Sequence, residues 1–368
     1  MKQQKMEELR NYRFGEKDGW RAVWMGEHRE LNLAEFLKVK RYLYANVQTI
    51  KEVHLQQYMQ QSLLKEVFEW MDTSPVLETI AITIIDLSVE SLLGLARVIQ
   101  KVHSIQTLLL MNHGRALPIE GLKHVCTALK SSSIQRLILR GYEDMPPLDD
   151  LFEVIQIMPY LRSFSLNWSN IGEENAFKLA QVLSKTSIQH LALDACDITH
   201  LGTQAILSAI LQCPTIEGLN LNKNDLAHDT CVDSIVELLA QNRIKELSIR
   251  DHYTMEQYMR IARDGVRECL SIEKLEVFPH GYSGHEYENA QAFVRLMGFP
   301  PLLKSLAIGR MNSQRGIVQP FLKRLHSEEA KILVALVSVN HVKRLGEHSP
   351  LRKLPVELIR RLNDFLNP

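Results

Sequence analysis

The segment Ile188-Gln189-His190-Leu191-Ala192-Leu193 decides the fold, because its spacing of apolar residues returns along most of the chain. In each copy, an apolar residue is followed by two more at the third and fifth places after it. Consecutive copies begin 27 to 31 residues apart. A period this regular predicts a solenoid, in which each unit buries its apolar face against the next. The nine copies begin at Leu77, Ile105, Ile134, Leu161, Ile188, Ile216, Ile244, Ile272 and Leu303.

Each unit has the same predicted order of secondary structure. Within the repeated phrase, apolar residues alternate with polar or small ones, which is typical of a short strand. Apolar residues at helical spacing then predict helices over 119–129, 173–183 and 202–211. Strands joined by helical crossovers must run parallel, so we expect about nine parallel strands, one per unit, with the helices outside.

The fifth unit continues past its strand with Cys196, Ile198 and Gly202, and the sixth unit places Asn224 where the fifth has Cys196. These units resemble leucine-rich repeats of the ribonuclease-inhibitor type. The resemblance covers about 76–310 and implies an α/β solenoid shaped as a curved horseshoe, with parallel strands inside. It also implies that Cys196 and Asn224 lie in a turn inside the solenoid, where they must satisfy or tolerate buried backbone polar groups.

The two ends of the chain do not repeat in this pattern. Residues 1–75 contain apolar residues at helical spacing over 31–44 and 53–71, which predicts an N-terminal helical cap. Residues 311–368 are predicted to form a C-terminal helical cap. A repeat array needs such caps because its terminal units would otherwise expose a hydrophobic cross-section to water.

Composition narrows the class of partner and the compartment. The chain has 368 residues, and its 43 basic and 43 acidic residues balance, so charge gives no reason to expect a nucleic acid partner. No apolar run approaches the ~20 residues of a membrane span, and the charged N-terminus lacks a signal-peptide core. Five cysteines without paired spacing favour a reducing compartment such as the cytoplasm. The chain also resembles repeat proteins that intracellular bacteria export into host cells by a specialised secretion system, which implies an effector role.

No group of residues predicts an active site, a metal site or a cofactor. His280 and His285 flank a glycine-rich turn, but no cysteine or carboxylate joins them at the spacing of metal ligands. His190 and Asp194 are expected on one strand surface, without a nucleophile beside them. The sequence therefore favours a non-enzymatic protein that binds another protein.

The strand register predicts which residues form the binding surface. The last two apolar residues of each phrase point into the core, so their neighbours point outward onto the inner curved face. Two groups result, an apolar and aromatic cluster followed by a mixed-charge strip. The candidate partner-binding residues are Leu109, Met111, Ile138, Arg140, Trp168, Asp194, Lys223, Arg250, Asp251 and Phe278. For the apolar cluster, the alternative is that Trp168 folds over its own loop and that Leu109 and Ile138 only cover the sheet. For the mixed-charge strip, the alternative is an ordinary solvated face without a binding role.

The last apolar pattern suggests a second function. Leu354, Pro355, Leu358, Leu362 and Phe365 resemble the opening helix of an F-box, the adaptor segment of some ubiquitin ligases. The same residues would also suit an amphipathic capping helix. The leading prediction is a monomeric scaffold that binds a protein partner, and the alternative is a substrate-recognition subunit of a ubiquitin ligase.

Overall fold

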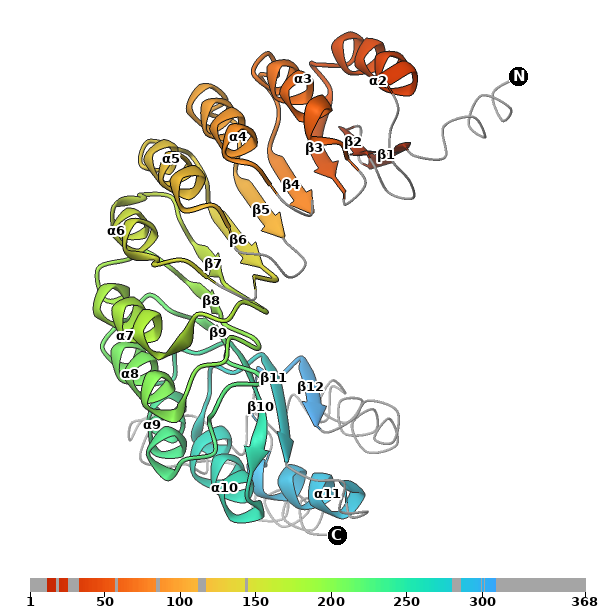
Figure 1. Ribbon diagram of the computed structural model, residues 1–368. Coiled ribbons are helices and arrows are strands. Elements are labelled where there is room, and N and C mark those ends of the chain that lie inside the picture. Colours follow the sequence, from red (N-terminus) through yellow and green to blue (C-terminus); the bar gives the residue numbers. More distant parts are fainter. Residues whose placement is uncertain are drawn as a thin grey trace, which may run out of the picture. The chain divides into compact units, whose positions relative to one another are not determined.

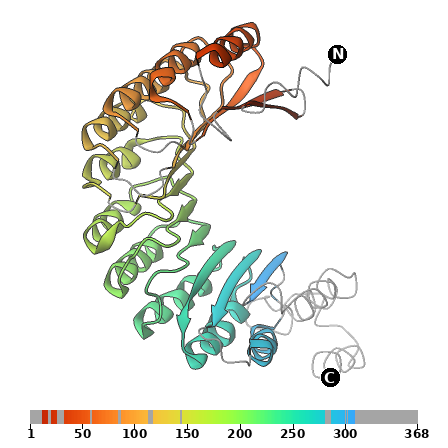
Figure 2. The same ribbon diagram turned by 45° about the vertical axis from the view of Figure 1, so that its right-hand side comes forward.

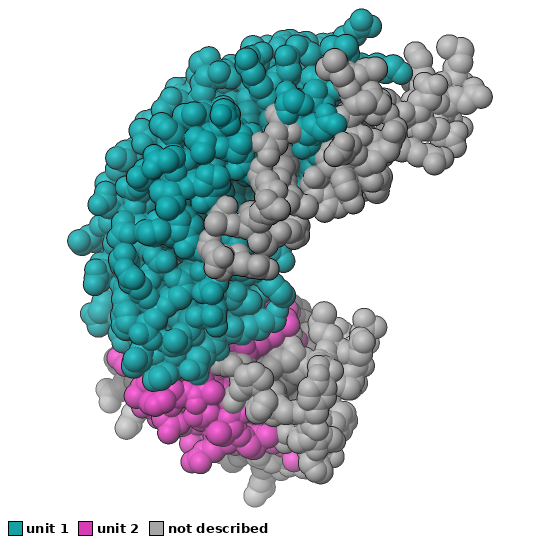
Figure 3. Space-filling model, in the orientation of Figure 1, with its two compact units in different colours: residues 1–225 teal, residues 226–368 magenta. Residues whose placement is uncertain are grey.

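The structure is a computed structural model, and it describes residues 12–17, 20–25, 33–56, 59–83, 87–111, 117–142, 145–279, 286–298, 300 and 302–308. The chain forms two compact units, Met1–Asp225 (unit 1) and Leu226–Pro368 (unit 2), which Figure 3 distinguishes by colour. Strands alternate with helices in both units, as expected for a repeat array (Figure 1).

Unit 1 contains nine described strands and seven described helices. Strands β2 to β9 run parallel, whereas β1 pairs antiparallel with β2. Figures 1 and 2 show the helices of this unit on the outer side of the strands. Its elements are β1 (Tyr12–Lys17), β2 (Trp20–Met25), α2 (Leu33–Ala45), β3 (Ile50–Leu55), α3 (Gln61–Met71), β4 (Thr79–Thr83), α4 (Val89–Lys101), β5 (Thr107–Met111), α5 (Ile119–Leu129), β6 (Arg136–Arg140), α6 (Asp149–Ile157), β7 (Ser163–Ser165), α7 (Gly172–Leu183), β8 (His190–Ala192), α8 (His200–Leu211) and β9 (Gly218–Asn220).

Unit 2 contains three described strands, which run parallel in the order β10, β11, β12. In its second repeat, the π-helix η1 continues α10, and the 3₁₀ helix η2 follows η1. The elements of unit 2 are α9 (Asp229–Ala240), β10 (Glu246–Tyr253), α10 (Met255–Arg260), η1 (Ile261–Gly265), η2 (Val266–Glu268), β11 (Lys274–Pro279), α11 (Glu286–Met297) and β12 (Ser305–Ile308).

The nine predicted strands are confirmed, since each repeated phrase contains one of the strands β4 to β12. In the phrase at Ile188, the side chains of Ile188, Leu191 and Leu193 are all buried. Strand β5 shows the predicted alternation, because Leu108 and Leu110 are buried while Leu109 and Met111 are partly exposed. The apolar period thus fixes which face of every strand joins the core, and the fold is a leucine-rich-repeat solenoid.

The range 1–75 differs from the all-helical expectation. Residues 53–55, expected within a helix, belong to strand β3, and helix α3 begins only at Gln61. Strand β3 pairs in parallel with β4, and its buried residues Ile50, Val53 and Leu55 have the spacing of the repeated phrase, 27 residues before the copy at Leu77. Apolar residues three apart fit one face of a helix as well as this phrase, so local spacing did not separate the two. The capping role of residues 1–75 remains a prediction.

The turns after β7 and β8 are each held by a side chain from the following repeat. The amide of Asn224 donates to the Leu193 carbonyl at 2.6 Å and accepts from the backbone N–H groups of Cys196 and Ile198 at 3.1 and 3.2 Å. One unit earlier, Sγ of Cys196 donates to the Leu166 carbonyl at 3.1 Å. The side chains of Asn224 and Cys196 therefore lie inside the array and satisfy backbone groups, as expected from their position in the repeat.

Candidate partner-binding surface

Two predicted residues of the apolar cluster face each other across neighbouring strands of unit 1. Leu109 of β5 is paired with Ile138 of β6, and Met111 is paired with Arg140 in the same ladder. Leu109, Met111 and Ile138 are only partly buried, and Arg140 is exposed. Directly opposed residues on one face of a sheet are close enough for their side chains to touch. The structure therefore brings these four residues together on the strand face of unit 1.

Trp168 lies in the turn just after β7, where the backbone turns left-handed. Its φ is 57°. The residues at the same position in the neighbouring repeats, two places after the last apolar residue of each phrase, also have positive φ: Gly141, Ala195 and Lys223. Backbone bonds connect these turns, with the N–H of Trp168 donating to the Asp194 carbonyl at 2.7 Å. Gly141 has no side chain and Ala195 has only a methyl group. The large indole ring of Trp168 therefore has room between two small neighbours.

Two cations hold the indole ring of Trp168. The Lys223 ammonium lies 3.8 Å from the ring centroid, and the Arg140 guanidinium carbon lies 5.8 Å from it. Lys223 lies two repeats further along the chain than Trp168, and Ala195 of the repeat between them has a side chain too small to separate the two. Each such pair contributes about 0.5–1 kcal/mol at an exposed site. Trp168 is nevertheless 47% exposed, so the ring is oriented without becoming part of the core.

Asp194 contributes an unused acceptor beside this ring. Its backbone N–H donates to Oδ1 of Asn167 at 2.7 Å, and its carbonyl accepts from Trp168. The Oδ1 atom of its carboxylate is buried, yet it accepts no hydrogen bond from the part of the chain that the structure describes. A buried acceptor without a partner costs about 1–3 kcal/mol.

The remaining predicted site residues belong to unit 2. Arg250 pairs with Glu276 at 3.1 Å, and the hydroxyl of Ser248 donates to the same carboxylate at 3.2 Å. Asp251 lies in β10 and Phe278 in β11, and the structure describes the backbone of these two residues but not their side chains. The mixed-charge strip is thus divided between the two compact units, with Asp194 and Lys223 in unit 1 and Arg250 and Asp251 in unit 2.

Sequence reasoning missed the contact between Trp168 and Lys223, which are 55 residues apart. The sequence did contain a signal for this contact, which is the residue type at one position in four consecutive repeats: Gly141, Trp168, Ala195 and Lys223. Where one repeat has a large ring, the next a small residue and the one after it a long cationic side chain, the cation can reach over the small residue to the ring. Reading this signal requires knowing that the four residues lie in line, which only the turn conformation establishes.

The five cysteines are buried: Cys126, Cys196, Cys213, Cys231 and Cys269. Burial raises the pKa of the Cys126 thiol to about 12, and it does the same to the pKa of Cys196. Since the thiolate is the reactive form, these two positions suit a structural role.

Alkylation should therefore spare the folded protein. We expect iodoacetamide to modify none of the five cysteines in buffer at neutral pH and all five in urea without a reductant. Mass spectrometry of the two samples measures both numbers. Rapid labelling of the folded protein would contradict the burial, and fewer than five adducts in urea would reveal a disulfide.

Several sequence-based predictions lie outside the described residues or concern only part of the chain. His280, His285 and the F-box-like residues 354–366 are outside the described ranges. Among the described residues, no group of three or more histidine, cysteine or acidic side chains has the arrangement of a metal site. Within the same residues, no helix has the length and apolar character needed to cross a membrane.

Comparison with known proteins gives limited similarity. No protein-family model and no curated protein sequence matches the chain. The structure resembles the actin-binding site 2 (ABS2) of leiomodin-1 with 18% identity, covering 49% of this chain and 88% of that chain, at a TM-score of 0.29. It also resembles TLR13 from the TLR13–ssRNA13 complex with 12% identity, covering 73% of this chain and 41% of that chain, at a TM-score of 0.40. At these identities and scores, neither likeness indicates what this chain binds.

Proposed function

We propose that this protein is a non-enzymatic scaffold that binds a partner protein on the strand face of unit 1. The observation that supports the proposal is Trp168, which is 47% exposed in the turn after β7 while the cations of Lys223 and Arg140 lie over its ring. Burial of this ring contributes nothing to the solenoid core. Tryptophan and arginine are enriched among the residues that dominate protein–protein binding energy.

The orientation of the ring supports this role. A side chain that is already fixed loses less conformational entropy when a partner covers it, which improves affinity. Leu109 and Ile138 supply apolar area on the same face, and Asp194 supplies a buried acceptor. We infer that the partner places an apolar side chain against Trp168.

Replacing Trp168 by alanine should weaken partner binding about thirtyfold or more, because truncation of an aromatic anchor costs ~2 kcal/mol or more. The free energy of unfolding should change by no more than about 2 kcal/mol, since only two exposed cation–π contacts of about 0.5–1 kcal/mol each are lost. The partner is first identified by proximity labelling with the wild-type protein. Purified partner is then titrated against both proteins, and urea unfolding is measured in parallel.

Phe177→Ala is the matched control, because Phe177 is an aromatic residue on helix α7 that is 39% exposed. It should bind the partner as the wild type does. If Trp168→Ala binds normally but unfolds at much lower urea, Trp168 is a structural residue and the proposed surface is wrong.

We extend the proposal to the finer predictions from the sequence. The interior ladder of Cys196 and Asn224 supports repeats of the ribonuclease-inhibitor type. The proposed site of action is the cytoplasm, including that of a host cell after export, and the proposed state is a monomer; both rest on sequence alone. The alternative, a ubiquitin-ligase subunit, rests on the pattern over 354–366. A pull-down of the ligase adaptor that is lost when residues 350–368 are deleted would favour the alternative.

A further inference from the structure

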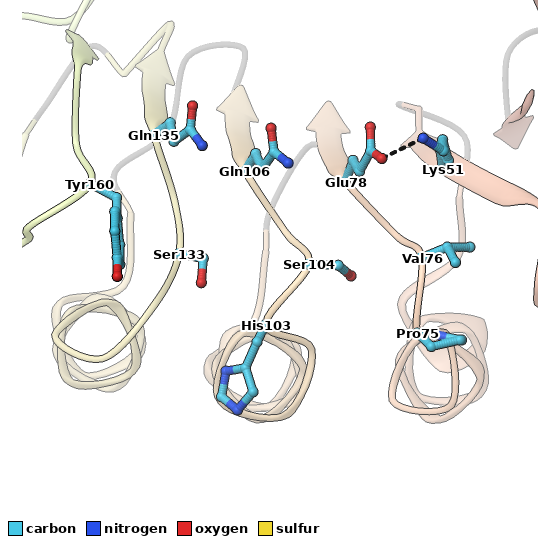
Figure 4. Close-up of a pocket in the computed structure, with 10 residues that line it drawn as sticks. All are labelled: Lys51, Pro75, Val76, Glu78, His103, Ser104, Gln106, Ser133, Gln135 and Tyr160. Carbon is cyan, nitrogen blue, oxygen red and sulfur yellow. Dashed lines mark hydrogen bonds and ion pairs between the residues drawn. The ribbon is translucent and has the colours of Figure 1, made fainter. Parts of the chain in front are cut away.

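A pocket of about 390 Å³ lies at the beginnings of strands β4, β5 and β6 in unit 1 (Figure 4). The turn that contains Trp168 instead follows the end of a strand, β7. Tyr160 stands at one end of the pocket, and the pair formed by Lys51 and Glu78 stands at the other. Between them lie the side chains of Gln106, Gln135 and Ser133, among others. The pocket therefore spans consecutive repeats at the edge of the sheet.

The two glutamines have the same position in consecutive units. The backbone N–H of Gln106 donates to the Glu78 carbonyl, and that of Gln135 donates to the Gln106 carbonyl, each at 2.8 Å. Their backbone groups are thus used within the sheet. Their side-chain amides are exposed and form no hydrogen bond with the described residues. Each amide offers one acceptor and two donors to a ligand.

The charge of the lining argues against an anionic ligand. Nζ of Lys51 lies 2.6 Å from Oε1 of Glu78, so the two charges of the lining compensate each other. The other polar groups are amides, hydroxyls and the imidazole of His103. A phosphate would require unpaired cations or a cluster of backbone N–H donors, whereas the N–H groups of Gln106 and Gln135 are already bonded. A neutral ligand with several hydroxyl groups suits this lining better.

The spacing of the glutamines argues against an extended peptide. Neighbouring strands lie about 4.8 Å apart, whereas an extended chain repeats its like-facing groups about every 6.8 Å. A peptide laid along the edge would therefore lose register with the glutamines after one unit. A single compact ring has no such repeat to match, and one amide can bind two adjacent hydroxyls through its donor and acceptor.

Tyr160 supplies an apolar surface for such a ring. It is 55% exposed, and Figure 4 shows its ring edge-on, with one face turned toward Ser133. An aromatic face can cover the C–H face of a sugar ring while the surrounding amides bind its hydroxyl rim. We propose that this pocket binds a neutral saccharide, with one pyranose ring against Tyr160 and its hydroxyls bonded to Gln106 and Gln135.

The test begins with the full chain on a printed array of neutral oligosaccharides, which also carries sulfated and phosphorylated glycans. The strongest neutral binder is then titrated by calorimetry. Tyr160→Ala should weaken binding about tenfold, and Gln135→Ala by ~3- to 10-fold, as expected for the loss of a packing face and of a hydrogen bond. Tyr160→Phe should retain binding, because it keeps the ring face. Gln212→Ala, at the exposed end of α8 outside the pocket, is the matched control.

Thermal melting should be unchanged in all four variants because the substituted side chains are exposed. Trp168→Ala should bind the oligosaccharide as the wild type does, which separates this proposal from the proposed protein-binding surface. The proposal is wrong if no neutral glycan binds, if only charged glycans bind, or if Tyr160→Ala and Gln135→Ala bind normally. Binding of adenosine or of a short peptide that is lost in Tyr160→Ala, measured by the same calorimetry, would likewise overturn the ligand class.

Discussion

Replacing Asn224 by alanine should destabilise the protein by about 3–5 kcal/mol, the largest effect we expect from one substitution. The side chain is 5% exposed, and its amide bonds the Leu193 carbonyl and the N–H groups of Cys196 and Ile198. Alanine would leave all three groups buried without this partner. Each unsatisfied group costs about 1–3 kcal/mol, and partial relaxation keeps the total below the sum of the maxima.

Equilibrium unfolding in urea measures this loss, and Asn170→Ala is the control. Asn170 lies in the corresponding turn of an earlier unit, but its side chain is exposed. Its replacement should change the free energy of unfolding by no more than about 0.5 kcal/mol. A loss below about 1 kcal/mol for Asn224→Ala would mean that the ladder does not hold these turns. Hydrogen exchange should become faster at the amides of Cys196 and Ile198 in the variant, which locates the effect.

Replacing Gly121 by valine should destabilise the protein by about 2–3 kcal/mol. Gly121 of α5 packs against Leu92 of α4, and a Cβ atom added to Gly121 would lie 2.9 Å from Cβ of Leu92. Because Cβ of Leu92 moves only with its backbone, the helices must separate. Overpacking of this kind costs typically 1–3 kcal/mol, whereas the better helix propensity of valine returns only about 0.4 kcal/mol. Because the steric cost is larger than this gain, the net effect of the substitution on stability is a loss.

A double-mutant cycle tests this mechanism. Cδ1 and Cγ of Leu92 also crowd the added Cβ atom. Leu92→Ala removes these two atoms and keeps Cβ, so part of the clash is relieved, and the combined loss for Gly121→Val and Leu92→Ala should fall short of the sum by at least ~0.5 kcal/mol. Thr127→Val, on the exposed side of α5, is the control and should lie within about 0.5 kcal/mol of the wild type. Strict additivity in the cycle would contradict the proposed contact.

The apolar period alone determined the strands of the array. At Ile188, Leu191 and Leu193, the alternation of side chains along a strand is a local property, so the sequence shows which residues enter the core. The regular step between copies shows that neighbouring units stack in register. The resemblance to repeats of the ribonuclease-inhibitor type implied the interior positions of Cys196 and Asn224, where a turn inside a solenoid must satisfy its own backbone.

The tertiary structure decided features that depend on several elements together. The spacing of Ile50 and Val53 fits a helix and a strand alike, and parallel pairing with β4 selected the strand. The strand register read from the sequence predicted Trp168 on the binding face. The contact of its ring with Lys223 depends on the left-handed turns and on the small side chain of Ala195 between them. The pocket beside Tyr160 likewise requires four stacked repeats, from the one that contains Lys51 to the one that ends at Tyr160. Local patterns specify which residues are buried, whereas contacts between side chains of different units depend on how those units stack.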